Sequence, residues 1–395
     1  MNREFRAVLE KLASTRPRLV EVLRKYGDLA LADYAPKLWE HTCKPESLFI
    51  EVLRKELLRR YSQEYVSGFI EYFGRRPVLQ TTHHLTPSVG PTFNSVDVIS
   101  MNGLKSDAYY PVGFCSGVAF SNPARSGALC FGTTDWEWVF PGGGKKLNEA
   151  LKSQKEREAH GDSEKRFSLI PASSRDAMVY GYRINDRILE KWDDVRTVFG
   201  EYPAPEDGQE YSDWCLAFCE ETQRKVFGFD RTVFFDLNRV VAEYLILAEE
   251  RGTEWPVDLE KDTTGLFLEN VARSKSDKIR PVTAKVTSKQ AAEKLKSKEW
   301  CPAVKTLFSV LIARNGIKCL GSFSQGDYLT EILPDSDTAG FDPALTTGRL
   351  QYEKNWMYSL DYLLRGESIP VNFFSEITVA EAAQPILTRL ADEPR

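Results

Sequence analysis

Residues 77–91 read PVLQTTHHLTPSVGP, and the character of the chain changes at this stretch. Val78 to Thr82 is typical of a short β-strand, and Leu85 to Pro91 has the proline, serine and glycine content of a turn. Two adjacent histidines, His83 and His84, lie where the strand meets the turn. The stretch therefore predicts a strand that ends in a polar loop.

The residues before this strand predict helices. Apolar side chains recur at helical spacing in two runs, which are Phe5, Val8, Leu9 and Leu12, and then Leu19, Val22, Leu23 and Tyr26. Gly27 follows the second run, where a left-handed helix end is common. A third helix is expected over residues 46–60. We expect a helical N-terminal region over residues 1–76 and a main domain over residues 77–395, with a single domain as the alternative.

The rest of the chain alternates irregularly between strand and helix patterns. Residues 109–120 predict a long strand, and residues 128–131 predict its partner in a hairpin. The expected elements further along are a strand over 232–235, a helix N-cap at Asp236, a helix over 302–315 ended by Gly316, a strand over 317–320, and a capping box formed by Thr378 and Glu381. This order predicts an α+β or α/β fold, with a mixed sheet covered by helices.

Composition limits the function classes. The 395-residue chain is 42% hydrophobic and 28% charged, with a net charge of −5, which disfavours a general nucleic-acid binder. No apolar run of about 18 residues occurs, so no membrane span or membrane partner is expected. Seven scattered cysteines, an odd number, do not form a disulfide framework. We expect a soluble cytoplasmic protein, with its oligomeric state open.

The histidine pair is the most informative candidate for chemistry. The chain has only four histidines, and imidazole titrates close to neutral pH, so His83 and His84 are candidate general bases. In a turn, one ring can face a pocket while the other anchors the loop. The alternative is a buried structural pair. The His-His-x-x-x-Asp-Gly motif of peptide-synthetase condensation domains begins in the same way, but Ser88 and Val89 replace its last two residues, so no family is assigned.

A metal site is the main rival interpretation of the histidine pair. Imidazoles with a carboxylate or thiolate hold zinc or iron. Asp97, Asp107 and Cys115 are available partners, but none stands at a recognised ligand spacing. No metal ligand is assigned, and the cofactor is left unknown.

Polar residues in three loops are candidate substrate contacts. Cys115 and Ser116 lie in a glycine-flanked strand segment, and Arg125 lies in the expected hairpin, where a guanidinium binds carboxylate or phosphate well. The loop after the strand over 317–320 adds Ser324, Gln325 and Asp327. Ligands of α/β proteins gather where strands end and helices begin. The alternatives are a buried cysteine, a solvated arginine and a simple turn.

Together these patterns favour an enzyme that acts on a small polar metabolite. A histidine general base and group transfer, of acyl type, are the preferred chemistry. The second hypothesis is a metal-dependent hydrolase or oxygenase that uses the histidine pair. The third is a non-catalytic binding or scaffold protein, which a large exposed apolar patch on residues 1–75 would favour.

Overall fold

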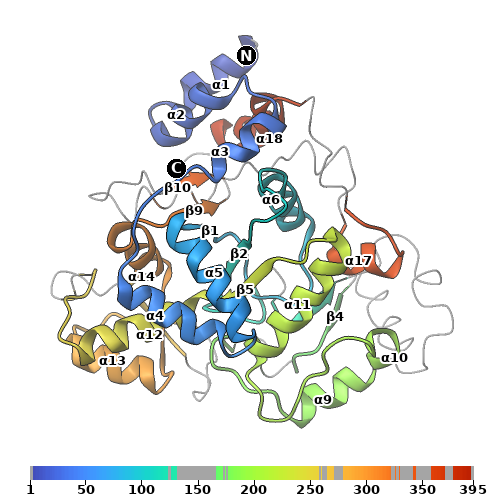
Figure 1. The fold of residues 1–395 in the computed structure, drawn as a ribbon, viewed down its shortest axis with the longest axis vertical. Coiled ribbons are helices and arrows are strands. Elements are labelled where there is room, and N and C mark those ends of the chain that lie inside the picture. The colour runs from blue at the N-terminus through green and yellow to red at the C-terminus, as the bar shows by residue number, and fades with distance from the viewer. Residues whose placement is uncertain are drawn as a thin grey trace.

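The structure is a computed structural model. It describes residues 3–392 except for 123–125, 131–165, 172–173, 175–176, 258, 260–264, 271–278, 322–324, 326–328, 330–340, 344–356 and 370–376. The fold is α/β, as predicted, with helices preceding a parallel sheet (Figure 1).

The described helices and strands are as follows. The helices are α1 Arg3–Leu12, α2 Pro17–Tyr26, α3 Leu31–Leu38, α4 Ser47–Leu57, α5 Gln63–Arg75, α6 Pro91–Asn102, α9 Asp186–Asp193, α10 Arg196–Phe199, α11 Tyr211–Phe227, α12 Leu237–Glu250, α13 Ser288–Lys296, α14 Val304–Phe308, the π-helix η2 Ser309–Arg314, α17 Ser359–Leu364 and α18 Val379–Asp392. The strands are β1 Val78–Gln80, β2 Tyr110–Phe114, β3 Ala128–Cys130, β4 Arg166–Ser168, β5 Thr232–Asp236, β6 Phe267–Glu269, β7 Arg280–Pro281, β8 Trp300–Pro302, β9 Lys318–Gly321 and β10 Phe341–Pro343.

The main sheet has the strand order β10-β9-β1-β2-β5, and every neighbouring pair is parallel. The chain starts at β1 in the middle, moves outward to β2 and β5, and then returns to the other side of β1 to add β9 and β10. This is the order of a doubly wound sheet, and its direction reverses between β1 and β9. The antiparallel pairs lie in two small separate sheets, β3-β4 and β7-β6-β8.

Alternating side chains of the sheet enter two different hydrophobic clusters. Val78 and Leu320 join α1, α2, α6, α11 and α18 on one face, whereas Leu79 and Cys319 join α4, α5, α12 and α14 on the other. Successive residues of a strand point to opposite faces, so two covered faces require apolar residues in succession. The result is a sheet between two helical layers. Helices on both sides of the expected boundary at residue 76 contribute to both clusters.

The side chains that follow α4 and those of α5 protect the outer strand β5. Tyr61 accepts a hydrogen bond on its hydroxyl from the main-chain nitrogen of Phe234 at 2.8 Å, and Tyr65 donates to the carbonyl of Thr232 at 2.8 Å. Arg60 donates to the carbonyl of Phe234 at 2.9 Å. These bonds occupy main-chain groups that an exposed edge would offer to another chain.

The two ends of the chain pack together. Helices α1 and α18 lie side by side at one end of the molecule (Figure 1). Arg16, which is buried, donates to the carbonyl of Leu390 at 3.0 Å. The predicted capping box is confirmed, because Thr378 Oγ1 accepts from the Glu381 nitrogen and the Glu381 carboxylate accepts from the Thr378 nitrogen.

Several sequence predictions need correction. Residues 128–130 pair with β4 and not with β2, which ends at Phe114, so the predicted hairpin is wrong. Gly27 has φ −58° and is right-handed, so the expected left-handed helix end is wrong. The helix over 302–315 changes to π-helical geometry at Ser309. Helices α3 and α5 lie within the region expected to be helical but were not predicted individually, and α6 begins at the end of a stretch expected to be a turn.

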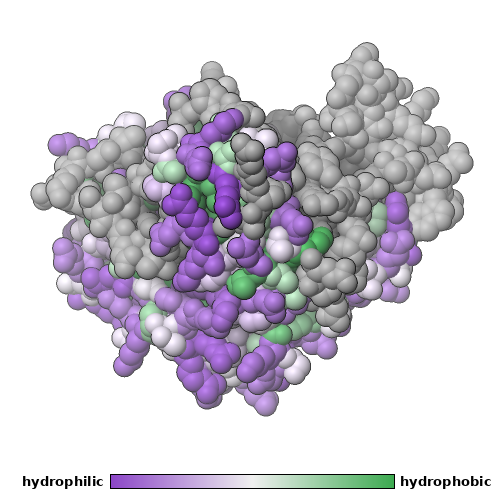
Figure 2. Space-filling model, turned by 90° about the horizontal axis from the view of Figure 1, so that it is seen from above, coloured by the Kyte–Doolittle hydropathy of each residue, from purple (hydrophilic) through white to green (hydrophobic). Residues whose placement is uncertain are grey.

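No described helix is long and apolar enough to cross a membrane. The described residues on the face in Figure 2 are mostly hydrophilic, with small hydrophobic patches. Across the described part of the chain, the large hydrophobic side chains that stand exposed are Leu58 and Val304.

Candidate functional site

The carboxyl ends of the parallel strands bring the predicted loops to one edge of the sheet. The segment after β1 contains His83 and His84, and the segment after β2 contains Ser116. Asn238 follows β5, and Gln325 follows β9. The edge includes the point between β1 and β9 where the winding of the sheet reverses, and doubly wound sheets bind ligands there.

An extra residue in the segment after β1 places the histidines. Gln80 pairs with Val112, and His84 pairs with Cys115. His84 follows Gln80 by four residues, whereas Cys115 follows Val112 by three, so the segment after β1 contains one residue more than the segment beside it. The additional residue is a bulge, and bulges redirect side chains. Thr81 leans toward β9, where its nitrogen donates to the carbonyl of Leu320 at 3.0 Å.

His83 is directed into the protein. It is 1% exposed, and its Nε2 lies 2.7 Å from Oδ1 of Asp97, on α6. Tyr110 donates to the same oxygen at 2.5 Å, and Gln223 donates to Oδ2 at 2.8 Å. The buried carboxylate thus accepts three hydrogen bonds, from β2, α11 and the loop after β1. Among the described residues, Nδ1 of His83 has no hydrogen-bond partner, although it is buried.

The network continues through Gln223 to a distant part of the chain. Ser359, at the start of α17, donates at 2.9 Å to the side-chain oxygen of Gln223, and it also lies 2.9 Å from Oδ1 of Asn94. Both Ser359 and Asn94 are fully buried. A connected buried network of this kind holds its members in one arrangement, because each lost partner leaves another polar group unsatisfied. It therefore makes His83 part of the framework beneath the loop.

His84 has a different environment. It is partly exposed, and its Nδ1 lies 3.2 Å from Oδ1 of Asn122. An amide oxygen accepts hydrogen bonds, so Nδ1 carries the proton and Nε2 keeps its lone pair. Burial lowers the pKa of His84, Asn122 opposes the change, and the neighbouring His83 lowers it further. Both rings also contact Phe93.

Ser116 forms structural hydrogen bonds to residues at the start of α12. Its hydroxyl donates to Oδ1 of Asp236 at 2.6 Å, and its nitrogen donates to Oδ1 of Asn238 at 2.8 Å. Asp236 caps α12, as predicted, by accepting from the Arg239 nitrogen at 3.1 Å. Burial raises the pKa of Asp236 to about 6, although Arg239 and the Ser116 hydrogen bond lower it. Ser116 is fully buried and contacts no solvent.

Cys115 contributes mainly through its main chain. Its nitrogen donates to the carbonyl of His83 at 2.8 Å, and its carbonyl accepts from the Leu85 nitrogen at 2.9 Å. Burial, with a smaller effect of Asp236, raises the pKa of the Cys115 thiol to about 12. A thiol with so high a pKa is a poor nucleophile at neutral pH.

Gln325 connects the loops on the two sides of the point where the winding reverses. Its side-chain nitrogen donates to Oγ1 of Thr81 at 2.8 Å, and it is 2% exposed. Oγ1 of Thr81 in turn donates to the carbonyl of Leu320 at 2.9 Å. Three other predicted contacts, Arg125, Ser324 and Asp327, lie outside the described residues.

No family model, curated protein or solved structure matches the chain. The site is therefore interpreted from its own residues.

Within the described segments, no three His, Cys, Asp or Glu side chains converge as a metal-binding group. His83 directs Nε2 to Asp97, and His84 directs Nδ1 to Asn122, so the two rings are held by separate partners.

Sequence reasoning missed the roles of Asp97, Gln223 and Asn122. Asp97 was considered only as a metal ligand. A local signal existed for it, since an acid within the predominantly apolar and uncharged segment 91–102 requires partners if that segment is buried. Gln223 and Asn122 carry no comparable signal.

Proposed function

We propose that this chain is an enzyme of the transferase type, which acts on a small polar metabolite at the carboxyl edge of the sheet. His84 is the general base, and group transfer of acyl type is the reaction class. One observation carries the proposal: the hydrogen bond from Nδ1 of His84 to Asn122 leaves Nε2 as a free base on a partly exposed ring. The setting in a cytoplasm is part of the proposal, and the seven free cysteines are consistent with it.

The geometry favours His84 over His83 as the residue that contacts substrate. His83 is almost completely buried and bonded to Asp97, whereas His84 is partly exposed. The lowered pKa of His84 keeps its imidazole unprotonated at neutral pH, which is the form that a base requires. His83 and Asp97 are positioning residues, which hold the loop that carries His84.

The proposed step is simple acid-base chemistry. Nε2 of His84 takes the proton of an acceptor hydroxyl or amine, while the acceptor's lone pair forms a bond to the acyl carbon. The tetrahedral intermediate then expels its leaving group, which recovers the proton from the imidazolium. General-base catalysis of this kind contributes about 10²–10⁴-fold to the rate.

The scaffold hypothesis has less support. It called for a large exposed apolar patch on residues 1–75, and the exposed large hydrophobic side chain within the described part of that region is Leu58. A single such residue is ordinary for a protein surface.

The experiment is a turnover screen with a paired variant. Purified protein is incubated with short-chain acyl thioesters and with polar amine and alcohol acceptors, and thiol release and acylated product are measured. For any active pair, His84→Gln is expected to lower kcat by about 10²-fold or more. Lys289→Gln is the control, since Lys289 is exposed on α13, a helix that contributes no residue to the histidine site.

Full turnover in a folded His84→Gln variant would contradict the proposal, as would an equal loss in Lys289→Gln. A His83→Gln variant tests the positioning role of His83 separately. His83→Gln is expected to lower kcat and to change the pH profile of the reaction, because the ring of His84 loses its support.

A further inference from the structure

A cavity lies at the edge of the sheet opposite the histidine site, at the amino ends of β1 and β2. Its volume is about 690 Å³, within the range of small-molecule pockets. It is lined by Pro36, Trp39, Glu40, His41, Thr42, Tyr72, Arg76, Gly103, Leu104, Lys105 and Ala108. These residues come from α3, from α5 and from the segments that follow α3, α5 and α6, so the cavity is separate from the histidine site.

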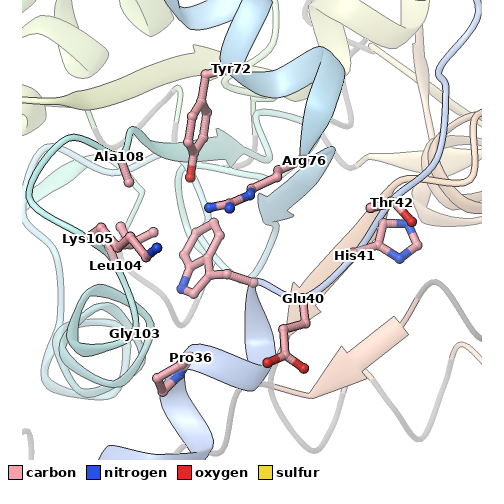
Figure 3. Close-up of a pocket in the computed structure, with 11 residues that line it drawn as sticks. Pro36, Glu40, His41, Thr42, Tyr72, Arg76, Gly103, Leu104, Lys105 and Ala108 are labelled. Carbon is pink, nitrogen blue, oxygen red and sulfur yellow. The ribbon is translucent and has the colours of Figure 1, made fainter.

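Two cations face this cavity. Figure 3 shows the guanidinium of Arg76 and the ammonium of Lys105 directed into the same space, with the hydroxyl of Tyr72 beside Arg76. Arg76 and Lys105 are exposed, and within the described residues neither forms an ion pair. The hydroxyl of Tyr72 is buried, and no hydrogen-bond partner with normal geometry is found for it in the described part of the chain.

Glu40 does not neutralise these cations. Its carboxylate is directed away from Arg76 in Figure 3 and pairs with Lys37 at 2.8 Å. Burial raises the pKa of the Tyr72 hydroxyl, Arg76 lowers it, and Asp107 raises it by less than Arg76 lowers it.

The helix ends oppose the cations but do not cancel them. Helices α3, α5 and α6 all end at the cavity, and each carboxyl end carries roughly half a negative charge. Lys318 covers the end of α3, because its Nζ donates to the carbonyl of Lys37 at 3.1 Å. The ends of α5 and α6 then contribute about one negative charge against the two positive charges of Arg76 and Lys105. The balance is positive.

We infer that this cavity is a binding site for a small organic anion. The carboxylate or phosphate of the anion lies between Arg76 and Lys105, and the apolar part of the anion lies against Trp39, Pro36 and Leu104. A planar guanidinium binds two oxygens of such a group at once, while the ammonium adds a point charge. The inference does not depend on the proposed function, because no residue of the histidine site lines the cavity.

The test is isothermal titration of the full chain with phenyl phosphate and benzoate, and with benzyl alcohol as a neutral probe. The expected result is saturable binding of at least one anion and none of the alcohol. Arg76→Gln is expected to weaken binding by about tenfold or more, the loss of one or two charge-assisted hydrogen bonds. Lys105→Gln is expected to weaken it less, because an ammonium forms no bidentate contact.

Arg75→Gln is the matched control. Arg75 precedes Arg76, is exposed, lies 3.6 Å from Glu71, and does not line the cavity, so the same change of charge should leave affinity within about twofold. Equal weakening in Arg75→Gln and Arg76→Gln would overturn the inference, since it would show only non-specific attraction. No saturable binding of either anion up to about 10 mM would also overturn it. So would loss of binding in His84→Gln alone, which would place the anion at the other edge.

Discussion

Nε2 of His83 lies 2.7 Å from Oδ1 of Asp97, and both side chains are almost completely buried. A carboxylate accepts hydrogen bonds, so Nε2 is the protonated nitrogen of this ring. In the next residue, Nδ1 of His84 lies 3.2 Å from the side-chain oxygen of Asn122. Two adjacent histidines are thus held in opposite tautomers.

The tautomers can be read directly by long-range ¹H–¹⁵N NMR on selectively labelled protein. We expect neutral His84 to carry its proton on Nδ1 and His83 to carry it on Nε2. Asn122→Ala is expected to release the tautomer of His84 and to leave that of His83 unchanged, because the Asn122 side-chain oxygen contacts the ring of His84, whereas His83 is held by Asp97. An Nε2-protonated His84 in the wild-type protein would contradict this assignment.

Asp97→Asn is expected to destabilise the protein by about 1–3 kcal/mol. The asparagine amide replaces one acceptor oxygen by a donor, and it then faces donors from His83, Tyr110 or Gln223 in a buried site. Urea unfolding measures the loss. Asp207→Asn, at an exposed position, should change stability by about 0.5 kcal/mol or less. Equal stabilities of the two variants would show that the network contributes nothing.

Asp236→Asn is expected to gain stability over the wild type as pH rises. The folded pKa of Asp236, about 6, is above its ordinary value of 3.8, so the folded protein binds the proton more tightly than the unfolded chain. This contribution is fully present below the unfolded pKa and is lost as pH rises through 6, at a cost of about 3 kcal/mol. Asparagine keeps the acceptor for Ser116 and the cap without this cost.

The measurement is the free energy of unfolding in urea from about pH 4 to pH 8, for both proteins. The difference between them should grow between pH 4 and 7 and then level off. Asp230→Asn, whose side chain is 85% exposed in the wild type, is the control and should show no such trend. A difference for Asp236→Asn that does not vary with pH would rule out the raised pKa.

Gly103→Ala is expected to cost about 3 kcal/mol of stability. A Cβ atom there would lie 2.2 Å from the carbonyl oxygen of Ala35, and main chain does not yield as a flexible side chain does. Gly74, in α5, is the matched position, because a Cβ there meets nothing within 4 Å. Gly74→Ala should stabilise the protein by about 0.5–1 kcal/mol. Thermal unfolding of both variants tests the contrast, and similar melting temperatures would contradict it.

Local features of the fold could be predicted from the sequence. The cap at Asp236 and the box of Thr378 and Glu381 each depend on hydrogen bonds across three residues, so neighbouring residue types are sufficient to specify them. The strands over 232–235 and 317–320 also agree with β5 and β9 to within one residue at each end. These apolar runs are bounded by polar or turn-forming residues, which is a local signal.

Pairing between distant segments could not be predicted in the same way. The sequence indicated a hairpin for residues 128–131, yet β3 pairs with β4, because strand pairing depends on which segments the topology brings together. Similarly, the histidine pair could be selected from residue type alone, but the division of roles between His83 and His84 follows from the bulge after Gln80.

From the sequence alone, the fold class was limited to α+β or α/β, and the helical N-terminal region and the polar loop that carries both histidines were predicted. Only the tertiary structure decided that Asp97 receives His83, Tyr110 and Gln223, the last of these 126 residues away. The physical reason is that propensities and caps act over a few residues. A buried carboxylate instead takes its partners from whatever elements pack around it, and these are fixed by the order of strands in the sheet.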